Sequence, residues 1–365
     1  MVLKRVGHFF GWILLGCNGI VSLLMLLCAF SPYIDPRTIP LLSCAGLAFP
    51  IFLLLNIAFM LFWLVVYRKY ALLPFLSLLA CIGALRSYMP INAPESEIPN
   101  GAIKILSYNV MAYAYDKPHK NGMPNEIVDY LAKSGADIIC TQEALLNKSK
   151  YSKFLNEDAV RDAMSEYPYY SHYQIGTHGL DCFSRYPILS AHRIKYESAD
   201  NGSMAYEIKV GKDTLLVINN HLESNKLTIN DKAIYRGLIK DPEYTIQKEA
   251  SRQLIGKVVD ASVIRSSQAD SIAKYIEESS CKNVVVCGDF NDSPLSYTHR
   301  VIRENLTDAF IESGSGLGIS YHKNGFYFRI DHILVSNNWK PYNCTVDKSI
   351  DASDHYPIWC YIGKR

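Results

Sequence analysis

The chain has 365 residues, of which 49% are hydrophobic, and its formal net charge is +2 at pH 7. The charge is unevenly distributed: residues 1–94 contain six basic residues and one acidic residue, which leaves residues 95–365 with a net charge of −3. A mildly acidic soluble part argues against a general nucleic-acid-binding protein, which needs excess cations to displace counterions from phosphates. The ten cysteines include no CxxC pair, which argues against a structural zinc site.

Three apolar runs occupy the first part of the chain. Residues 6–30 are almost wholly apolar, residues 41–66 carry no charge, and residues 71–85 form a shorter run that ends at Arg86. The first two runs are long enough to cross a bilayer, and the third is marginal. We therefore expect residues 1–91 to be a membrane anchor of about three transmembrane helices.

The side of the membrane depends on the third run. Lys4 and Arg5 at the start of the chain, and Arg68 and Lys69 after the second run, are expected on the cytoplasmic side. Three spans would then place the rest of the chain on the periplasmic or extracellular side of the inner membrane. A third run that only lies on the membrane would leave it in the cytoplasm. Residues 14–17 also resemble a bacterial lipoprotein processing site, although the later apolar runs favour an anchor.

The sequence pattern changes after residue 91, and this change indicates a second domain. Residues 92–101 contain two prolines and two glutamates and predict a linker. Residues 102–365 form a separate domain, with short β-like runs at 103–110, 137–143, 180–184, 204–210, 214–221 and 284–289. Apolar residues at helical spacing predict helices at 124–133 and 244–279. Cys140 and Cys287 lie inside strand-like runs and are expected in the core.

Polar side chains recur where the predicted strands end. Five strands end in polar residues and a sixth begins directly after a polar pair: Asn109, Glu143, His221, Asp289 with Asn291, Asp331, and Asp354 with His355. Because strand ends of a packed sheet lie close together, these groups are expected in one cleft. Carboxylates, amides and imidazoles without cysteine suit Mg²⁺ or Mn²⁺. Such a set fits hydrolysis of a phosphate ester by an activated water.

Seven ordered motifs give this pattern a family resemblance. They are Ser107–Val110, Thr141–Glu143, Phe183–Ile188, Asn219–Leu222, Gly288–Asn291, Arg329–Ile333 and Ser353–His355. With them, residues 103–362 resemble the endonuclease/exonuclease/phosphatase superfamily of deoxyribonuclease I-like phosphohydrolases, in a membrane-anchored bacterial form. The resemblance implies an α+β fold, a four-layer sandwich in which two mixed β-sheets pack face to face between outer helices.

The resemblance also implies a metal site. Glu143 would be the principal metal ligand, with Asn109 beside it and Asp354 near the metal. The expected ion is Mg²⁺ or Mn²⁺. Considered alone, Asn109 could simply be a turn residue at the end of a strand. Glu143 alone would usually be a solvated residue at the start of a loop.

The remaining site residues would have catalytic roles by the same resemblance. Asp289 would orient or deprotonate the attacking water, and Asn291 would hold Asp289 and the phosphate. His221 and His355 would contact the scissile phosphate. Asp331 would support His355 or a second metal, and Asp354 would also fix that imidazole. Considered alone, His221 or His355 is more often a structural histidine than a ligand. A structural role does not explain why both histidines occur beside strand ends.

The predicted function is a membrane-anchored, metal-dependent phosphodiesterase or phosphatase. Its substrate would be a phosphate ester such as a lipid head group, a nucleotide or nucleic acid. A metal-dependent nuclease is the first alternative, and a non-catalytic membrane-bound binding module is the second. Residues 223–244 are expected to line the substrate side, where Lys226, Lys232, Arg236 and Lys240 would be solvated or would meet a phosphate-rich head group. His332 is left as a surface or core residue, and Arg265 and Gln268 as structural residues.

Overall fold

A computed structural model of the chain describes residues 2–114, 124–147, 155–198, 200–228, 231, 247–323 and 325–365. Lys232, Arg236 and Lys240, expected near the substrate, lie outside the described residues.

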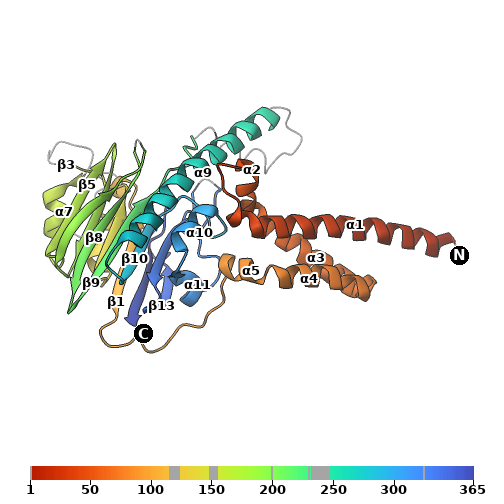
Figure 1. The fold of residues 1–365 in the computed structure, drawn as a ribbon, viewed down its shortest axis with the longest axis horizontal. Helices are drawn as coiled ribbons and strands as arrows, with labels where there is room; N and C mark the ends of the chain where they lie inside the picture. Colours follow the sequence, from red (N-terminus) through yellow and green to blue (C-terminus); the bar gives the residue numbers. More distant parts are fainter. Residues whose placement is uncertain are drawn as a thin grey trace.

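Two six-stranded mixed sheets form the centre of the second domain (Figure 1). The first sheet has the order β13 (Trp339–Val346), β14 (Ile358–Lys364), β1 (Ile103–Asn109), β2 (Ile138–Gln142), β6 (His178–Ser184) and β5 (Tyr169–Ile175). The second has the order β11 (Leu306–Asp308), β12 (Asp331–Ser336), β10 (Val284–Asp289), β9 (Asp213–His221), β8 (Gly202–Val210) and β7 (Ile188–Ile194). A short pair, β3 (Leu146–Asn147) and β4 (Leu155–Asn156), lies apart from both.

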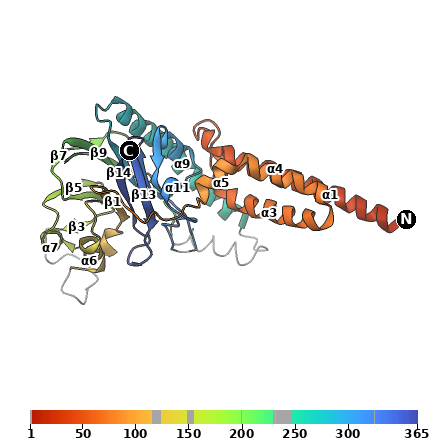
Figure 2. The ribbon, with the colours of Figure 1, turned by 90° about the horizontal axis from the view of Figure 1, so that it is seen from below.

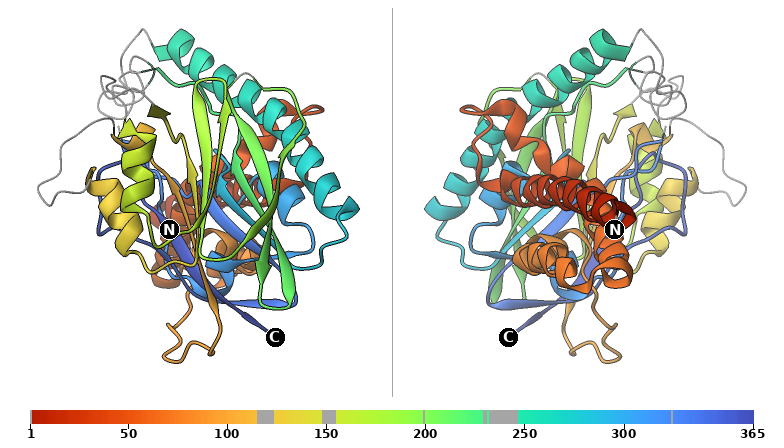
Figure 3. Two further views of the ribbon diagram at one scale, coloured as in Figure 1. Left: turned by 90° about the vertical axis from the view of Figure 1, so that its left-hand side faces the viewer. Right: turned by 90° about the vertical axis from the view of Figure 1, so that its right-hand side faces the viewer.

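Helices cover the outer faces of both sheets, as the left view of Figure 3 shows. The helices α6 (Glu126–Lys133) and α7 (Glu157–Ala163) bury apolar residues against the first sheet. The long helix α9 (Gln247–Glu278) and α10 (Tyr297–Arg303) pack on the second, and α11 (Ala309–Ser313) lies near β13. The inner faces meet in one apolar core that contains Cys140 and Cys287, as expected. The four-layer sandwich predicted from the sequence is therefore confirmed.

Strand direction brings the site residues to one edge of the two sheets. β1 runs parallel to β2, and β9 runs parallel to β10, so these four strands end together. β14 is antiparallel to β1, and β12 is antiparallel to β10, so both begin at that edge. The prediction that Asp331 ends a strand is therefore wrong: Asp331 opens β12 and pairs directly with Asp289. The antiparallel direction keeps it at the same edge.

The N-terminal helices extend away from the sandwich (Figures 1 and 2). They are α1 (Val2–Phe30), α3 (Phe49–Val66), α4 (Leu72–Ala80) and α5 (Ile82–Tyr88), joined through α2 (Pro40–Ser43) and the 3₁₀ turns η1 (Ser31–Tyr33), η2 (Ala45–Ala48) and η3 (Arg68–Ala71). The segments Phe9–Tyr33 and Ala45–Val66 are long and apolar enough to cross a membrane. The third predicted run is a pair of helices bent by 60° at Cys81, two residues before Gly83. Glycine near a break is a common cause of a kink.

These helices are packed on the sandwich at the end where α10 begins. Leu295, just before α10, belongs to an apolar cluster with Met25 and Phe49 of α1 and α3. A Cβ added to Gly46 would lie 2.1 Å from the carbonyl oxygen of Leu295, so only glycine permits this approach. Arg37 also donates to Asp270 of α9 across 2.7 Å. The N-terminal helices and the sandwich are therefore in direct contact.

Candidate active site

Asn109 joins two carboxylates at the shared sheet edge. Its Nδ2 atom lies 3.1 Å from Glu143 Oε1 and 3.1 Å from Asp289 Oδ2. Its Oδ1 atom accepts a hydrogen bond from the Met111 amide at 3.2 Å. In this orientation Asn109 positions the two carboxylates relative to one another, and its oxygen faces the backbone.

Glu143 has a backbone conformation that glutamate seldom adopts. Its φ is +55°, in the left-handed region that is costly for residues with a Cβ atom. The next amide, that of Ala144, donates to the Gly179 carbonyl at 2.9 Å, and the Glu143 carbonyl accepts from Ala112 at 2.9 Å. These two backbone bonds hold the turn that presents a partly exposed carboxylate beyond β2. Backbone strain of this kind is concentrated at functional sites.

Asp289 is held by groups on both sides of its carboxylate. Its Oδ1 atom accepts from the Asn291 amide at 2.8 Å, and its Oδ2 atom is the one that Asn109 contacts. The Asn291 side chain donates to the Leu222 carbonyl at 3.0 Å. Asp289 is 1% exposed, so its position is fixed by β10 and by the turn after it.

His355 and Asp331 form a buried pair next to Asp289. His355 Nδ1 lies 2.8 Å from Asp331 Oδ2, and His355 Nε2 lies 3.6 Å from Asp289 Oδ2. The hydroxyl of Ser320 accepts hydrogen bonds from the amides of Ile330 and Asp331, both at 3.1 Å, and so fixes the start of β12. The ring of His355 is thus oriented by Asp331.

His221 enters the same group from the end of β9. Its Nε2 atom lies 3.5 Å from Glu143 Oε1 and 3.9 Å from Asp289 Oδ2. Asp354 lines the same cavity as Glu143, Asp289 and His355. The structure therefore brings all eight predicted site residues to one edge, with Asp354 at its margin.

The buried charges shift the protonation of the group. Burial raises the pKa of Asp289 from 3.8 to about 7; the charge of His355 opposes this rise and that of Asp331 adds to it. Burial disfavours the charged form of His355, but Asp331 and Asp289 outweigh it and hold its pKa well above 6.5. A carboxyl that titrates near neutral pH beside an imidazolium is suited to proton transfer.

Comparison with known protein families identifies the family to which the chain belongs. A family model described as the Endonuclease/Exonuclease/phosphatase family matches residues 106–355. The chain belongs to this family. A second model, described as a domain of unknown function (DUF8431), matches residues 11–88. No curated protein matches the chain.

Several solved structures are similar to the chain. An endonuclease/exonuclease/phosphatase from Beutenbergia cavernae has a TM-score of 0.50 at 12% identity, and the match covers 72% of each chain. D. rerio TDP2, solved with a single-strand DNA product, has a TM-score of 0.48 at 15% identity over 72% of this chain and 99% of that one. A family protein from Bacteroides thetaiotaomicron has a TM-score of 0.46 at 15% identity over 72% of this chain and 97% of that one. At 12% identity the likeness to the Beutenbergia cavernae protein concerns the fold alone. Endonuclease/exonuclease/phosphatase enzymes are hydrolases that act on phosphate esters, and so is this one.

Enzymes of the endonuclease/exonuclease/phosphatase family depend on a divalent metal, and the donor set here fits one. Several carboxylates converge, and among the described residues the buried Oδ1 atom of Asp331 has no hydrogen-bond partner. Atoms of Asp289, Asp331 and His355 lie within 4.8 Å of one another. Hydrogen bonds already occupy much of that cluster, whereas Glu143 opens into the cavity. Oxygen ligands of this kind suit a hard divalent cation.

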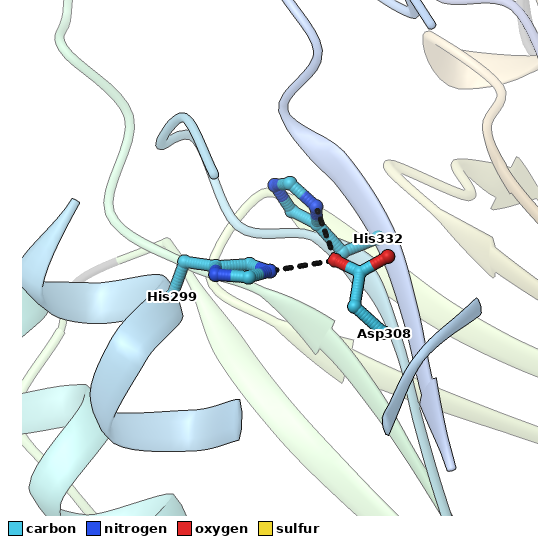
Figure 4. A group of neighbouring side chains, drawn as sticks. All are labelled: His299, Asp308 and His332. Carbon is cyan, nitrogen blue, oxygen red and sulfur yellow. Dashed lines mark hydrogen bonds and ion pairs between the residues drawn. The ribbon is translucent and has the colours of Figure 1, made fainter. Parts of the chain in front are cut away.

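A second buried cluster contains His299, Asp308 and His332 (Figure 4). Asp308 Oδ2 lies 2.8 Å from His299 Nε2 and 3.9 Å from His332 Nδ1. Burial lowers the pKa of both imidazoles, that of His332 to about 3. Asp308 also accepts from the Ile311 amide at 2.9 Å and so caps α11. We interpret this cluster as a structural link between α10, β11 and β12 that holds His332 beside Asp331.

A cavity of about 670 Å³ extends from the site to the N-terminal helices. Its polar end contains Glu143, Asp289, Asn291, Asp354 and His355. Its other walls come from residues 41–51, from α9, and from the segment 321–330. The part played by residues 41–51 was not expected from the sequence, because they lie in the second apolar run, which was assigned to the membrane.

Structural residues behind the cavity hold the loops after β9 and β10. The Arg265 guanidinium donates to Asp292 Oδ2 at 3.2 Å and to the Glu223 carbonyl at 2.8 Å. Gln268 accepts from the Glu223 amide at 2.9 Å. These contacts agree with the structural role expected for Arg265 and Gln268. Ser320, which fixes Asp331, was missed, since a serine in a loop gives no signal of its own.

Proposed function

We propose that the chain is a membrane-anchored, metal-dependent phosphoesterase that hydrolyses a phosphodiester or phosphomonoester bond. The observation that carries this proposal is the convergence of Glu143 and Asn109 with the Asp289, Asp331 and His355 group at one sheet edge. A non-catalytic binding module would not need a buried carboxyl that titrates near neutrality beside a buried imidazolium.

The chemistry follows from the positions of the side chains. A water oxygen bonds to phosphorus as the ester P–O bond breaks, and the alcohol leaves with a proton. Asp289, fixed by Asn291 and Asn109, orients the water and accepts its proton. His355 and His221 face the reacting phosphoryl group and stabilise its growing negative charge, and Asp331 keeps His355 oriented and charged.

Glu143, with Asp354 at the margin of the cavity, is the proposed place for the divalent cation. Mg²⁺ or Mn²⁺ held there would neutralise charge on the phosphoryl oxygens. Asn109 holds the Glu143 carboxylate toward this place through its 3.1 Å contact.

The arrangement of the anchor supports an inner-membrane location with the catalytic domain on the outer side. α1 ends at the sandwich, α3 leads away from it, and α4 with α5 leads back (Figures 1 and 2). Arg68 and Lys69 therefore lie at the end far from the sandwich, where the first residues of the chain also lie. Basic residues favour the cytoplasmic side, and the bent pair α4–α5 counts as one span in this proposal. The proposed domains remain residues 1–91, 92–101 and 102–365.

Nuclease activity is the alternative within the same chemistry, and the charge of the cavity disfavours it. Besides the imidazole of His355, the basic residues among the described lining residues are Lys226 and Arg265. Lys226 pairs with Glu223 at 2.6 Å, and Arg265 pairs with Asp292. A nucleic-acid backbone requires available cations along its path.

The experiment that tests this function is a substrate panel with the full-length protein in nanodiscs. Bis-p-nitrophenyl phosphate, p-nitrophenyl phosphate, a phospholipid and plasmid DNA are each incubated with Mg²⁺, Mn²⁺ or EDTA. We expect release of alcohol from a phosphate ester with either metal and none with EDTA. Absence of metal-dependent turnover on every substrate would reject the proposal, and preferential cutting of DNA would select the nuclease alternative.

A further inference from the structure

The cavity that contains the catalytic groups has an apolar far end. Leu41, Leu47 and Ile51 line it from the anchor, and Leu254, Ile255, Val258 and Val259 line it from α9. Leu41 is 63% exposed, Ile51 59% and Ile255 49%. Grouped exposed apolar side chains beside a polar site indicate a binding surface. The phosphate chemistry alone does not require such a wall.

The position of this wall relates it to the membrane. Residues 41–51 include α2, η2 and the start of α3, and Leu47 and Ile51 belong to the candidate span Ala45–Val66. A residue at the end of a membrane span lies at the surface of the bilayer. The apolar end of the cavity is therefore expected to face the lipid, and the catalytic end lies further into the sandwich.

The charges that line the cavity also favour an apolar ligand over a polyanion. The three described basic residues on its lining, Lys226, Arg265 and His355, are already paired with carboxylates, so these residues offer little attraction to a polyanion. Its volume of about 670 Å³ is within the usual range for a site that encloses a small molecule.

We infer that the substrate is a membrane lipid phosphate ester, whose apolar chain lies in the groove between residues 41–51 and α9 while its phosphate lies at Asp289 and Glu143. This inference rests on the proposed function for the identity of the reacting group. It assigns Leu41, Leu47 and Ile255 a role in substrate specificity. The anchor then both holds the enzyme at the bilayer and forms one wall of its site.

A series of p-nitrophenyl alkyl phosphates tests this inference, because the scissile bond stays the same while the alkyl group lengthens from methyl to octyl to dodecyl. The full-length protein in nanodiscs of fixed lipid composition is assayed with Mg²⁺. We expect kcat/KM to rise by roughly tenfold or more from methyl to dodecyl, since each buried methylene adds to binding. Equal values across the series would overturn the inference while leaving the phosphoesterase function intact.

Two isoleucines on α9 provide matched variants. Ile255 lines the cavity, whereas Ile264, which is 39% exposed on the same helix, does not. Ile255→Gln is expected to lower kcat/KM for the dodecyl ester by about fivefold and to leave the methyl ester unchanged. Ile264→Gln should change neither value and controls for partitioning of the ester into the bilayer. An equal effect of both substitutions would contradict the inference.

A binding measurement independent of turnover separates the two proposals. A dodecyl phosphate that carries a photoreactive diazirine near the end of its chain is irradiated with the protein, and the labelled peptides are identified by mass spectrometry. Labelling within residues 41–51 and 254–259, displaced by excess unlabelled dodecyl phosphate, is the expected result even for an inactive protein. Labelling confined to the bilayer-facing sides of α1 and α3 would overturn the inference. The same competition with a diacyl phospholipid or a polyisoprenyl phosphate distinguishes the lipid classes.

Discussion

The Nδ1 atom of His355 donates a hydrogen bond to Asp331 Oδ2 across 2.8 Å, and the opposite ring nitrogen faces Asp289 at 3.6 Å. The imidazole thus lies between two buried carboxylates from paired positions of β10 and β12. This arrangement keeps the ring charged and fixes its direction, which is what a group that stabilises a phosphoryl transition state requires.

Replacement of Asp331 tests whether that pair acts as a unit. Asp331→Asn preserves the shape but removes the charge that keeps His355 protonated, so kcat is expected to fall by roughly 10²-fold. His355→Ala should cost at least as much, and the double variant should be no worse than His355→Ala alone, because groups that act together are not additive. Multiplicative losses in kcat/KM would show that Asp331 acts separately from His355.

The stability of the metal-free protein should depend on pH through Asp289. Its pKa is raised from 3.8 to about 7 in the folded protein, so its contribution to stability is present below pH 3.8 and is lost as the pH rises toward 7. The loss is on the order of a few kcal/mol. Thermal unfolding with EDTA should therefore show wild type losing stability between pH 4 and about 7. Asp289→Asn should remove this part of the loss, and parallel curves for the two proteins would contradict the prediction.

The glycine before Asp289 is required by geometry. Gly288 has a φ of +127°, and a Cβ atom there would lie 2.1 Å from the Asn220 carbonyl oxygen. Gly288→Ala is expected to destabilise the fold by about 2–4 kcal/mol and to abolish activity through displacement of Asp289. Gly211→Ala is the matched control: it has a φ of +58° but open space around its Cβ position, so it should cost only about 1 kcal/mol. Urea unfolding measures both, and equal losses would contradict this explanation.

Reporter fusions test the proposed side of the membrane. Alkaline phosphatase, which is active only outside the cytoplasm, is expected to be active when fused after Arg365 and inactive when fused after Lys69. The reason is that Arg365 belongs to the sandwich, whereas Lys69 lies in the turn between α3 and α4 at the far end of the helices, and Arg68 and Lys69 favour the cytoplasm. An inactive fusion after Arg365 would place the domain in the cytoplasm and would require the bent pair α4–α5 to stay on one side.

Local patterns were sufficient to predict most strands and the polar residues at their ends, whereas the sandwich itself was expected from the family resemblance. The strand-like runs at 204–210, 214–221 and 284–289 correspond to β8, β9 and β10. Strand direction was not predictable from these patterns. Asp331 was therefore assigned to the end of a strand, when it begins an antiparallel one.

The cavity wall shows what local patterns cannot provide. Residues 41–51 and α9 are far apart in the sequence and meet only through the packing of the anchor on the sandwich. The apolar residues at 41–51 were explained by a membrane span, and those of α9 by the apolar face of a helix. Nothing in the sequence therefore linked either set to the site. The bend at Cys81 was also not predicted, because residues 71–85 form a single apolar run in the sequence.

Replacement of Glu143 tests the central claim, that this edge is a metal-dependent phosphoesterase site, most directly. Full-length wild type, Glu143→Gln and the control Glu278→Gln, an exposed glutamate on α9, are assayed with bis-p-nitrophenyl phosphate across a Mg²⁺ titration. We predict that wild type and Glu278→Gln release p-nitrophenol in a Mg²⁺-dependent way and that Glu143→Gln loses this activity by about 10³-fold while remaining folded. Undiminished Mg²⁺-dependent hydrolysis by Glu143→Gln would contradict the assignment of the site.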